Sequence, residues 1–441
     1  MITVLMYLHY IISVLLPVCI KNIDSFILEE NERPNIILIM ADDLGIEGLG
    51  VYGSDDYNTP NLDFLANHGM RFNHAYSTPL CTPSRVQLMT GKYNHKNYLG
   101  FGLLDSRETT FANYFKQQGY ETLIVGKWQL FGNSKQQRLA GGKIGSRPED
   151  AGFNDYCLWQ IDQLGSRYKT PKLSIKDNGG EAKKYPGYGP DYFVDYIDQF
   201  IEKNSDHPFL IYYPMVLPHD PFEPTPDNET FELETPSINH PKYFGSMVQY
   251  MDKLVGKIVH MVENKGLTNN TLLLFLSDNG TSRKITSRQN GHQIQGGKGL
   301  TTSAGTHVPL IAYWPGTITQ GSINNHLIDF TDFMPTLLDV AGINVIDEQL
   351  DGISFYSQLI GENSEPRQWV YCHYAPNWGK FKKAIYIHDK QWKVYRNGDV
   401  FNMIDDPLER TPIHVDVLDL EDVKKIVELR NILSQTTPGY D

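Results

Sequence analysis

The sequence predicts an α/β protein with a mainly parallel sheet sandwiched by helices, followed by a small C-terminal α+β subdomain of antiparallel strands and a helix. Three observations lead to this prediction. Apolar runs of strand length alternate with segments of helical periodicity over most of the chain. Several of these runs end abruptly at polar residues, which is typical of buried parallel strands. After about residue 345 the rhythm changes to short strands separated by turns.

Each predicted element has a local reason. Residues 35–40 form an Ile-rich run of strand length, which we expect to be buried within the sheet. Thr59 and Pro60 provide an N-cap and a first helical residue, and Gly69 ends that helix. The same criteria predict further helices at 111–118, 192–201 and 247–259, and strands at 121–125, 209–215, 271–277 and 308–313.

The remaining segments divide into a loop and a small subdomain. Residues 132–190 are rich in Gly, Lys, Ser and Pro, and we expect a long loop excursion at the mouth of a site. A main domain is expected at residues 33–345 and a C-terminal subdomain at residues 346–441. The elements predicted in this subdomain are strands at 384–388, 391–396 and 400–403 and a closing helix at 421–433.

Composition and charge restrict the classes of function. The 441 residues are 40% hydrophobic and 21% charged, as in ordinary folded proteins. The formal net charge of −13 disfavours a nucleic-acid partner, because such proteins neutralise phosphates with a basic surface. An anionic substrate would therefore need a locally positive pocket in a negative protein.

Residues 1–22 predict a signal peptide, because an apolar run fills most of this segment. No Lys or Arg precedes the run, so a membrane anchor or a buried N-terminal helix is the alternative. Cleavage would direct the protein to a secreted, periplasmic or lysosomal location and would remove Cys19. If Cys81 is modified as well, only Cys157 and Cys372 remain for one disulfide, which sequence alone does not establish.

Polar residues gather where the predicted strands end. The six residues are Asp42, Asp43, Lys127, His219, Asp278 and Asn279. Sites in parallel sheets form beyond the carboxyl ends of the strands, so we expect these side chains to meet. Two adjacent pairs among them, Asp42-Asp43 and Asp278-Asn279, offer oxygen donors, which suit a hard cation such as calcium. For either pair taken alone, a helix cap or a turn is the alternative.

The segment Cys81-Thr82-Pro83-Ser84-Arg85, followed by Gly91-Lys92, is the central motif of the chain. Pro83 fits the first turn of a helix, so Cys81 would lie at a helix N-terminus, where free N–H groups attract an anion. Arg85 would lie one turn later on the same face. A low-pKa thiol is one interpretation of such a cysteine, and a structural cysteine ahead of an ordinary helix is the other.

In its context this motif resembles the signature of the formylglycine-dependent sulfatases, which are arylsulfatase-like members of the alkaline phosphatase superfamily. Four further blocks resemble the family in the same order, at residues 35–45, 59–63, 277–280 and 296–299. The similarity runs from about residue 33 to 345, and the turn at 405–407 resembles the family's C-terminal hairpin. The resemblance implies an alkaline-phosphatase/sulfatase-like fold with a sulfatase catalytic domain at residues 33–345.

The resemblance also implies the chemistry. Cys81 would be oxidised to formylglycine (3-oxoalanine) by a formylglycine-generating enzyme during maturation. One hydroxyl of the hydrated aldehyde would attack sulfur and expel the alcohol, and the second would re-form the aldehyde and release sulfate. The metal ligands implied for calcium are Asp42, Asp43, Cys81, Asp278 and Asn279.

Further matched residues concern the sulfate group. Lys127 and Lys298 match two sulfate-contacting lysines, and both stand beside glycines that suit close approach of the backbone to a ligand. With Arg85 they would supply the positive field of the pocket. His219 matches the substrate-binding histidine that protonates the leaving oxygen.

One catalytic position departs from the family pattern. Gln129 stands two residues after Lys127, where the family usually has a histidine that assists sulfate release. Glutamine forms hydrogen bonds but does not accept a proton at neutral pH, so release of sulfate from the enzyme is the step in question. His292 and His307 are the candidate replacements, and His307 itself stands where the family commonly has Arg.

Three functions remain to be weighed. The leading one is a sulfatase acting on a sulfated small molecule or glycan, preferably a sulfated polysaccharide or glycosaminoglycan. The second is a phosphodiesterase or phosphonate hydrolase of the same superfamily, because some of these share the C-x-P-x-R motif. The third is a non-catalytic binder of sulfated glycans, with Gln129 as the sign of lost activity; the other five matched catalytic residues argue against it. The sequence does not indicate the oligomeric state.

Overall fold

The computed structural model describes residues 33–232, 238–345, 350–437 and 439. The predicted leader at residues 1–22 lies outside these ranges, as does residue 346, where the C-terminal subdomain was expected to begin. Within the described residues, every helix is too short or too polar to cross a bilayer.

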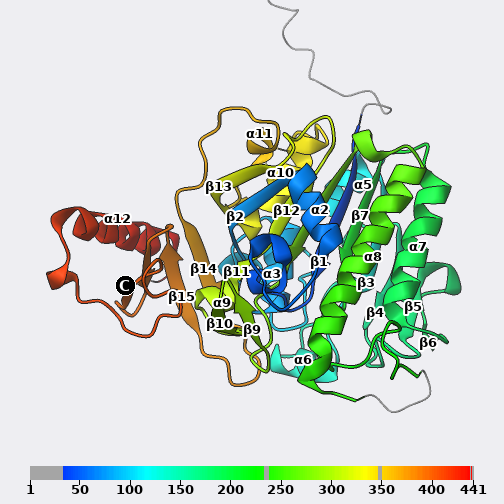
Figure 1. The fold of residues 1–441 in the computed structure, drawn as a ribbon, viewed down its shortest axis with the longest axis horizontal. Coiled ribbons are helices and arrows are strands. Elements are labelled where there is room, and N and C mark those ends of the chain that lie inside the picture. The colour runs from blue at the N-terminus through cyan, green and yellow to red at the C-terminus, as the bar shows by residue number, and fades with distance from the viewer. Residues whose placement is uncertain (1–32, 233–237, 346–349, 438, 440–441) are drawn as a thin grey trace, which may run out of the picture.

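Parallel strands form the centre of an 11-stranded sheet (Figure 1). The five central strands are, in spatial order, β8 (Thr271–Ser277), β1 (Asn35–Ala41), β7 (Phe209–Pro214), β3 (Glu121–Lys127) and β4 (Asp155–Trp159). Each neighbouring pair among them is parallel. Every residue of β1, β7 and β8 is buried, because helices cover both faces of the sheet, and this is why these strands are continuous apolar runs.

Further strands extend the sheet on both sides of this centre. Next to β8 lies β12 (Leu310–Tyr313), and the sheet continues through β2 (Met70–Tyr76), β11 (His307–Val308) and β13 (Ser322–Asp329). Next to β4 lie β5 (Lys172–Ile175) and β6 (Ala182–Lys184). These added pairings are antiparallel except for β2 with β13.

Alternate residues of β1 face two different helical layers. Ile37 and Ile39 belong to the core cluster that contains α2 (Pro60–His68), α7 (Gly189–Asn204) and α8 (Phe244–Asn264). Ile36 and Leu38 belong to the opposite cluster, which contains α3 (Cys81–Thr90), α5 (Phe111–Gln117) and α10 (Phe333–Val340). The shorter helices are α4 (Asn94–Asn97), α6 (Ser134–Leu139), α9 (Ser303–Thr306) and α11 (Tyr356–Leu359). The predicted sandwich of a parallel sheet between helices is confirmed.

The C-terminal part is a second, four-stranded antiparallel sheet with a helix against it (Figure 1). Its strands pair in chain order: β14 (Val370–Tyr374), β15 (Ala384–His388), β16 (Trp392–Tyr395) and β17 (Val400–Asn402). The last helix, α12 (Leu420–Thr436), packs Ile426, Leu429 and Leu433 into the core of this sheet. A separate hairpin of β9 (Thr286–Gln289) and β10 (His292–Gln295) precedes α9.

Some local expectations are wrong. Residues 132–190 are not one loop, because they contain α6, β4, β5 and β6 and widen the main sheet. β2 and β13 were not predicted, because polar residues such as Arg71 and Asn73 interrupt their apolar pattern. Pairing with distant strands stabilises them, and local pattern does not reveal such pairing. Cys157 and Cys372 are free and buried in different sheets, so the possible disulfide does not form.

A buried ion pair connects the C-terminal part to the main domain. The Arg367 guanidinium donates from Nε to Asp332 Oδ2 at 2.8 Å, and its Nη1 donates to the hydroxyl of Tyr93 at 3.0 Å. The side chains of Arg367 and Asp332 are 3% and 2% exposed. Such a pair costs much desolvation, but removal of one partner leaves an uncompensated buried charge.

We therefore predict that Arg367→Met lowers the free energy of unfolding by about 3–5 kcal/mol, measured by urea denaturation. The matched control is Arg288→Met, which removes an ion pair with Asp56 whose side chains are 60% and 26% exposed. That change should leave the free energy of unfolding almost unchanged, because solvent screens exposed pairs. Equal losses in the two variants would contradict the structural role given to Arg367.

Buried histidines lie at the contact between the two sheets. The His388 ring packs edge-on against Tyr76 at a centroid distance of 4.5 Å, and Tyr76 stacks on His307 at 4.9 Å. Burial lowers the pKa of His307 to about 4 and that of His388 to about 3. Lys393 adds to the effect at His388, and His74 adds to it at His307. Both rings are therefore neutral in the folded protein at neutral pH.

This contact should be acid-labile. Below the unfolded pKa of about 6.5 the unfolded chain binds more protons than the folded one, so stability is lost as pH falls toward about 4. We predict that His388→Gln flattens the fall in unfolding free energy between pH 7 and pH 5, measured by urea denaturation at each pH. His260→Gln, on the exposed face of α8, should leave the slope unchanged. An unaltered slope in the His388 variant would contradict the prediction.

Candidate active site

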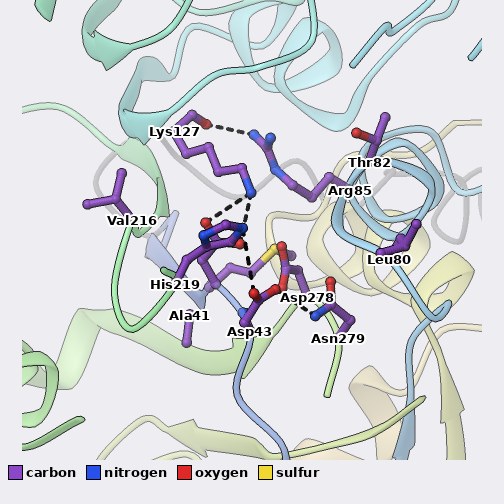
Figure 2. A network of polar contacts seen from close by, with 12 residues as sticks. Ala41, Asp43, Leu80, Thr82, Arg85, Lys127, Val216, His219, Asp278 and Asn279 are labelled. Atoms are coloured by element: carbon purple, nitrogen blue, oxygen red, sulfur yellow. Dashed lines mark hydrogen bonds and ion pairs between the residues drawn. The ribbon is translucent and has the colours of Figure 1, made fainter. Parts of the chain in front are cut away.

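The six polar residues expected at the strand ends do converge at one edge of the sheet, and Figure 2 labels all of them except Asp42. β1, β3, β7 and β8 are adjacent and parallel, so the residues that end or follow them lie side by side. The first residue of α3 faces the same edge. Lys298, from the loop between β10 and α9, completes the group. The strand topology therefore assembles side chains that are up to 255 residues apart in the chain.

The most buried contact of the site is an ion pair between Lys127 and Asp42. Lys127 Nζ donates to both carboxylate oxygens of Asp42, at 2.8 and 2.9 Å, and both side chains are 1% exposed. Burial alone would raise the pKa of Asp42, but the nearby cations, Lys127 first, hold it well below its usual range. Burial acts in the opposite sense on Lys127, and Asp42 raises the pKa of this ammonium nonetheless. Both groups are charged at neutral pH.

A second group of charges centres on Asp43. Lys298 Nζ donates to Asp43 Oδ2 at 2.5 Å and lies 2.9 Å from Nε2 of His219. The other ring nitrogen, Nδ1, lies 2.6 Å from the carbonyl oxygen of Asp220 and 3.0 Å from its carboxylate. Nδ1 therefore carries the proton that is donated to Asp220, and Nε2 points into the site as an acceptor.

The remaining acidic and amide groups suit a cation. Burial, with Asp42 and Asp43 close by, raises the pKa of Asp278 well above its usual range. Asn279 donates from Nδ2 to Asp43 Oδ1 at 2.8 Å, while its own Oδ1 is buried without a hydrogen-bond partner among the described residues. One ligand atom each from Asp42, Cys81 and Asp278 lie within 4.8 Å of one another. This set of donors, with its excess of negative charge and an orphaned amide oxygen, fits a hard cation.

Cys81 is the first residue of α3, as predicted, and it is 2% exposed. Burial raises the pKa of its thiol, and Lys127 offsets only part of this effect. The interpretation of Cys81 as a low-pKa thiol is therefore wrong. The helix start is fixed by Ser84, whose Oγ donates to the carbonyl of Leu80 at 3.0 Å and also bonds to Thr78.

Arg85 lies on the same helix but does not point its guanidinium at the charged groups. It donates from Nη1 to the Trp128 carbonyl and from Nη2 to the Lys127 carbonyl, each at 2.7 Å (Figure 2). The side chain is 1% exposed. Arg85 thus joins α3 to the end of β3 and holds the backbone that carries Lys127.

Gln129, which stands where the family usually has histidine, lies in a strained backbone conformation. Its φ is 45°, and that of Gln160 beside it is 58°. The two are joined by a hydrogen bond from Gln129 N to Gln160 O of 2.9 Å. The side-chain Oε1 atoms of both residues are buried without a hydrogen-bond partner among the described residues. The amide oxygen of Gln129, two residues after Lys127 in the chain, is therefore unpaired among the described residues.

The glycines beside the two lysines have a different role from the one expected. A Cβ on Gly126 (φ 107°) would lie 2.1 Å from the carbonyl oxygen of Pro214 in β7, and one on Gly297 would lie 2.4 Å from Ala304. Both glycines therefore permit close approach of the protein's own backbone, not of a ligand. The candidate replacements for Gln129 also lie elsewhere: His292 is exposed on β10, and His307 contacts the carbonyl of Asn73.

Three residues of the site escaped the sequence analysis. Arg167 stacks its guanidinium 4.1 Å from the ring centroid of Trp159 and places Nη1 3.9 Å from Asp42 Oδ2. Tyr168 donates its hydroxyl to the backbone carbonyls of Val216 and His219. Asp220 orients His219, as described above. The Arg-Tyr pair lies in the segment interpreted as a loop, and the adjacency of His219 and Asp220 was the one available signal.

Comparison with known proteins supports the resemblance to sulfatases. Residues 34–343 match the model of the Sulfatase family, and residues 298–436 match that of the N-sulphoglucosamine sulphohydrolase C-terminal region. Arylsulfatase A of Bos taurus is 31% identical over 381 residues, which cover 78% of this chain and 71% of the relative. N-acetylgalactosamine-6-sulfatase of Canis lupus familiaris is 28% identical over 403 residues, covering 83% and 74%.

Solved structures are similar over nearly the whole chain. Ps i-CgsB in complex with k-i-k-neocarrahexaose has a TM-score of 0.72 at 26% identity, covering 92% of this chain and 94% of that one. The phosphonate monoester hydrolase of Agrobacterium radiobacter has a TM-score of 0.66 at 18% identity, covering 91% and 96%, and shares the fold alone. Because the family model spans residues 34–343, the chain belongs to the sulfatase family of sulfuric ester hydrolases.

Proposed function

We propose that this protein hydrolyses sulfate esters of a sulfated carbohydrate, with formylglycine at position 81 as the nucleophile. The observation that carries this proposal is the position of the Cys81 side chain. Its Sγ lies within 4.8 Å of carboxylate oxygens of both Asp42 and Asp278, and Lys127 and Lys298 act on it electrostatically. A neutral buried thiol is a weak nucleophile, whereas an oxidised, hydrated side chain would present hydroxyl oxygens to the same charged groups.

Calcium is the cation we infer for this site. Asp42, Asp43, Asp278 and Asn279 would hold it, because all four offer oxygen atoms, as calcium prefers. When bound, such an ion polarises the sulfate ester and stabilises a charged nucleophile. The carboxylates of Asp42 and Asp43 would then share their charge between the ion and the lysines, so that the lysines are more available to a sulfate.

His219 is the residue we assign to proton donation. The oxygen of the departing alcohol needs a proton as its bond to sulfur breaks. Nε2 of His219 points into the site beside Lys298, and Nδ1 is held by Asp220. The hydrogen bond from His219 and the neighbouring Lys284 keep the pKa of Asp220 well below its usual range, so an ionised carboxylate orients the ring through Nδ1.

A sulfated polysaccharide or glycosaminoglycan is the substrate class we propose. One similar protein is named for a sulfatase of an acetylated amino sugar, and another was solved with an oligosaccharide. Maturation by a formylglycine-generating enzyme fits an exported protein, with residues 1–22 as the leader. The C-x-P-x-R motif leaves hydrolysis of phosphate or phosphonate esters as the activity to be tested in parallel.

One prediction from the proposed function concerns the chemical state of position 81. Peptide mass spectrometry of protein from a host with the modifying enzyme should find formylglycine there, and Cys81→Ala should lower kcat on the sulfated sugar by about 10⁴-fold or more. The matched control is Cys157→Ala, a buried cysteine in β4 that should retain activity. A plain thiol at position 81 in fully active protein, or faster hydrolysis of phosphonate esters than of sulfate esters, would contradict the proposal.

The second prediction concerns Gln129. Without a proton acceptor at this position, we expect a rapid burst of alcohol followed by slow steady-state turnover, seen by stopped-flow measurement. Gln129→His should raise the steady-state rate about tenfold or more, because it supplies an acid–base group for sulfate release. Gln129→Ala is the matched control and should give no gain. A Gln129→His variant with unchanged turnover would exclude this role for the position.

A further inference from the structure

A hollow of about 500 Å³ adjoins the active site on the side of the C-terminal sheet. We call it the inner hollow, and its lining includes Arg283, Gly299, Tyr374, Lys380, Phe381 and Lys382. Gly299 directly follows Lys298, and its N–H donates to the carbonyl of Pro79 at 2.8 Å. Gly299, which lines the inner hollow, is thus the neighbour of Lys298 in the chain. It is also bonded to Pro79, which lies two residues before Cys81.

Contacts from the C-terminal part hold the inner hollow against the active site. The Tyr374 hydroxyl donates to the carbonyl of Gly299 at 3.4 Å, and the Phe381 ring packs so closely that a Cβ on Gly299 would lie 1.9 Å from it. Tyr374 shares a hydrophobic cluster with Cys81, against which Phe381 also packs. The loop between β14 and β15 thus contributes to one wall of the inner hollow, close to Cys81.

A second hollow of about 580 Å³ continues from the first. We call it the outer hollow. It shares Thr301, Lys382 and Ala384 with the inner hollow and adds Lys383 and Arg396. The two together extend away from the catalytic groups over the edge of the C-terminal sheet. Their combined size exceeds what a single sulfate group needs.

The charge of these hollows opposes that of the whole protein. Lys380, Lys382 and Lys383 are exposed, and none of them forms an ion pair within the described ranges of the chain. The outer hollow has two acidic residues: Glu409 is already bound by Lys393 at 2.7 Å, and Asp399 accepts a hydrogen bond from Asn397 Nδ2 at 2.7 Å. In a chain of net charge −13, the cationic residues that line the two hollows outnumber the acidic ones, and such a surface attracts an anion.

We propose that the inner and outer hollows bind the sulfated sugars next to the one that is cleaved, so that the substrate is a polyanionic glycan chain rather than a single sugar. This proposal rests on the proposed function, because it places the scissile sulfate at Cys81. The half-buried ring of Phe381 offers apolar surface to a sugar face, whereas Tyr374 is buried behind it. The lysines meet sulfate or carboxylate groups along the chain. Binding should therefore weaken with salt, because these cations are exposed.

The test is the triple variant Lys380→Gln, Lys382→Gln, Lys383→Gln, which we call the loop variant. The matched control, Lys116→Gln, Lys203→Gln, Lys424→Gln, makes the same change of charge at exposed positions on three other helices. Substrates are a sulfated hexasaccharide and the corresponding sulfated monosaccharide. The loop variant should raise KM for the hexasaccharide about tenfold at low salt, with less effect in 1 M NaCl, and leave kcat and the monosaccharide constants unchanged.

Calorimetry with the hexasaccharide, in a Cys81→Ala background, separates this proposal from the proposed function. Loss of hexasaccharide affinity in the loop variant, but not in the control, supports the chain-binding site even if the wild-type protein hydrolyses no sulfate ester. Unchanged affinity in the loop variant, or an equal loss in the control, overturns it. Loss of binding to phosphatidylserine vesicles with unchanged hexasaccharide affinity overturns it as well and assigns the lysines to a membrane surface.

Discussion

Charges buried at one edge of the parallel sheet must be balanced, and this constraint governs the rest of the molecule. Asp42, Asp43 and Asp278 lie close together, and each of them is 1% exposed. Isolated carboxylates at such depth are costly, so each needs a cation or a proton. Lys127 and Lys298 satisfy the first two. Asp278 is buried beside two other negatively charged groups, so the site is suited to a positive ion.

This balance of charge depends on neighbouring side chains that keep the charged residues in position. Arg85 binds the two carbonyls that follow the end of β3, and so it fixes Lys127. Tyr168 holds the backbone of His219, and Asp220 fixes its ring. These supports come from α3, from the segment between β4 and β5, and from the loop after β7. A change in any of them would move a charge away from its partner while leaving the list of charged residues intact.

The C-terminal sheet completes the surroundings of Cys81, the residue that we propose as the nucleophile. It packs Cys372, Tyr374 and Tyr386 in the same cluster as Cys81, and Phe381 of its first loop packs against this cluster. It is fastened to the main domain by the buried pair of Arg367 and Asp332. The segment that encloses the chemistry is therefore the same one that provides the exposed lysines. An acidic protein thus carries exposed lysines close to Cys81, at the place where we propose that the substrate chain binds.

The sequence by itself determined the alternation of buried strands and amphipathic helices, because those patterns reflect local burial and periodicity. It also determined which polar residues end the strands and that Cys81 begins a helix, since Pro83 and the apolar runs are local signals. Only the tertiary structure decided that Arg85 serves the backbone, that burial keeps the Cys81 thiol neutral, and that Arg167 reaches Asp42. Those outcomes depend on depth and on distances between residues far apart in the chain. The polar strands β2 and β13 and the extension of the sheet by residues 132–190 belong to the same class, because pairing with distant partners stabilises them and leaves no local pattern.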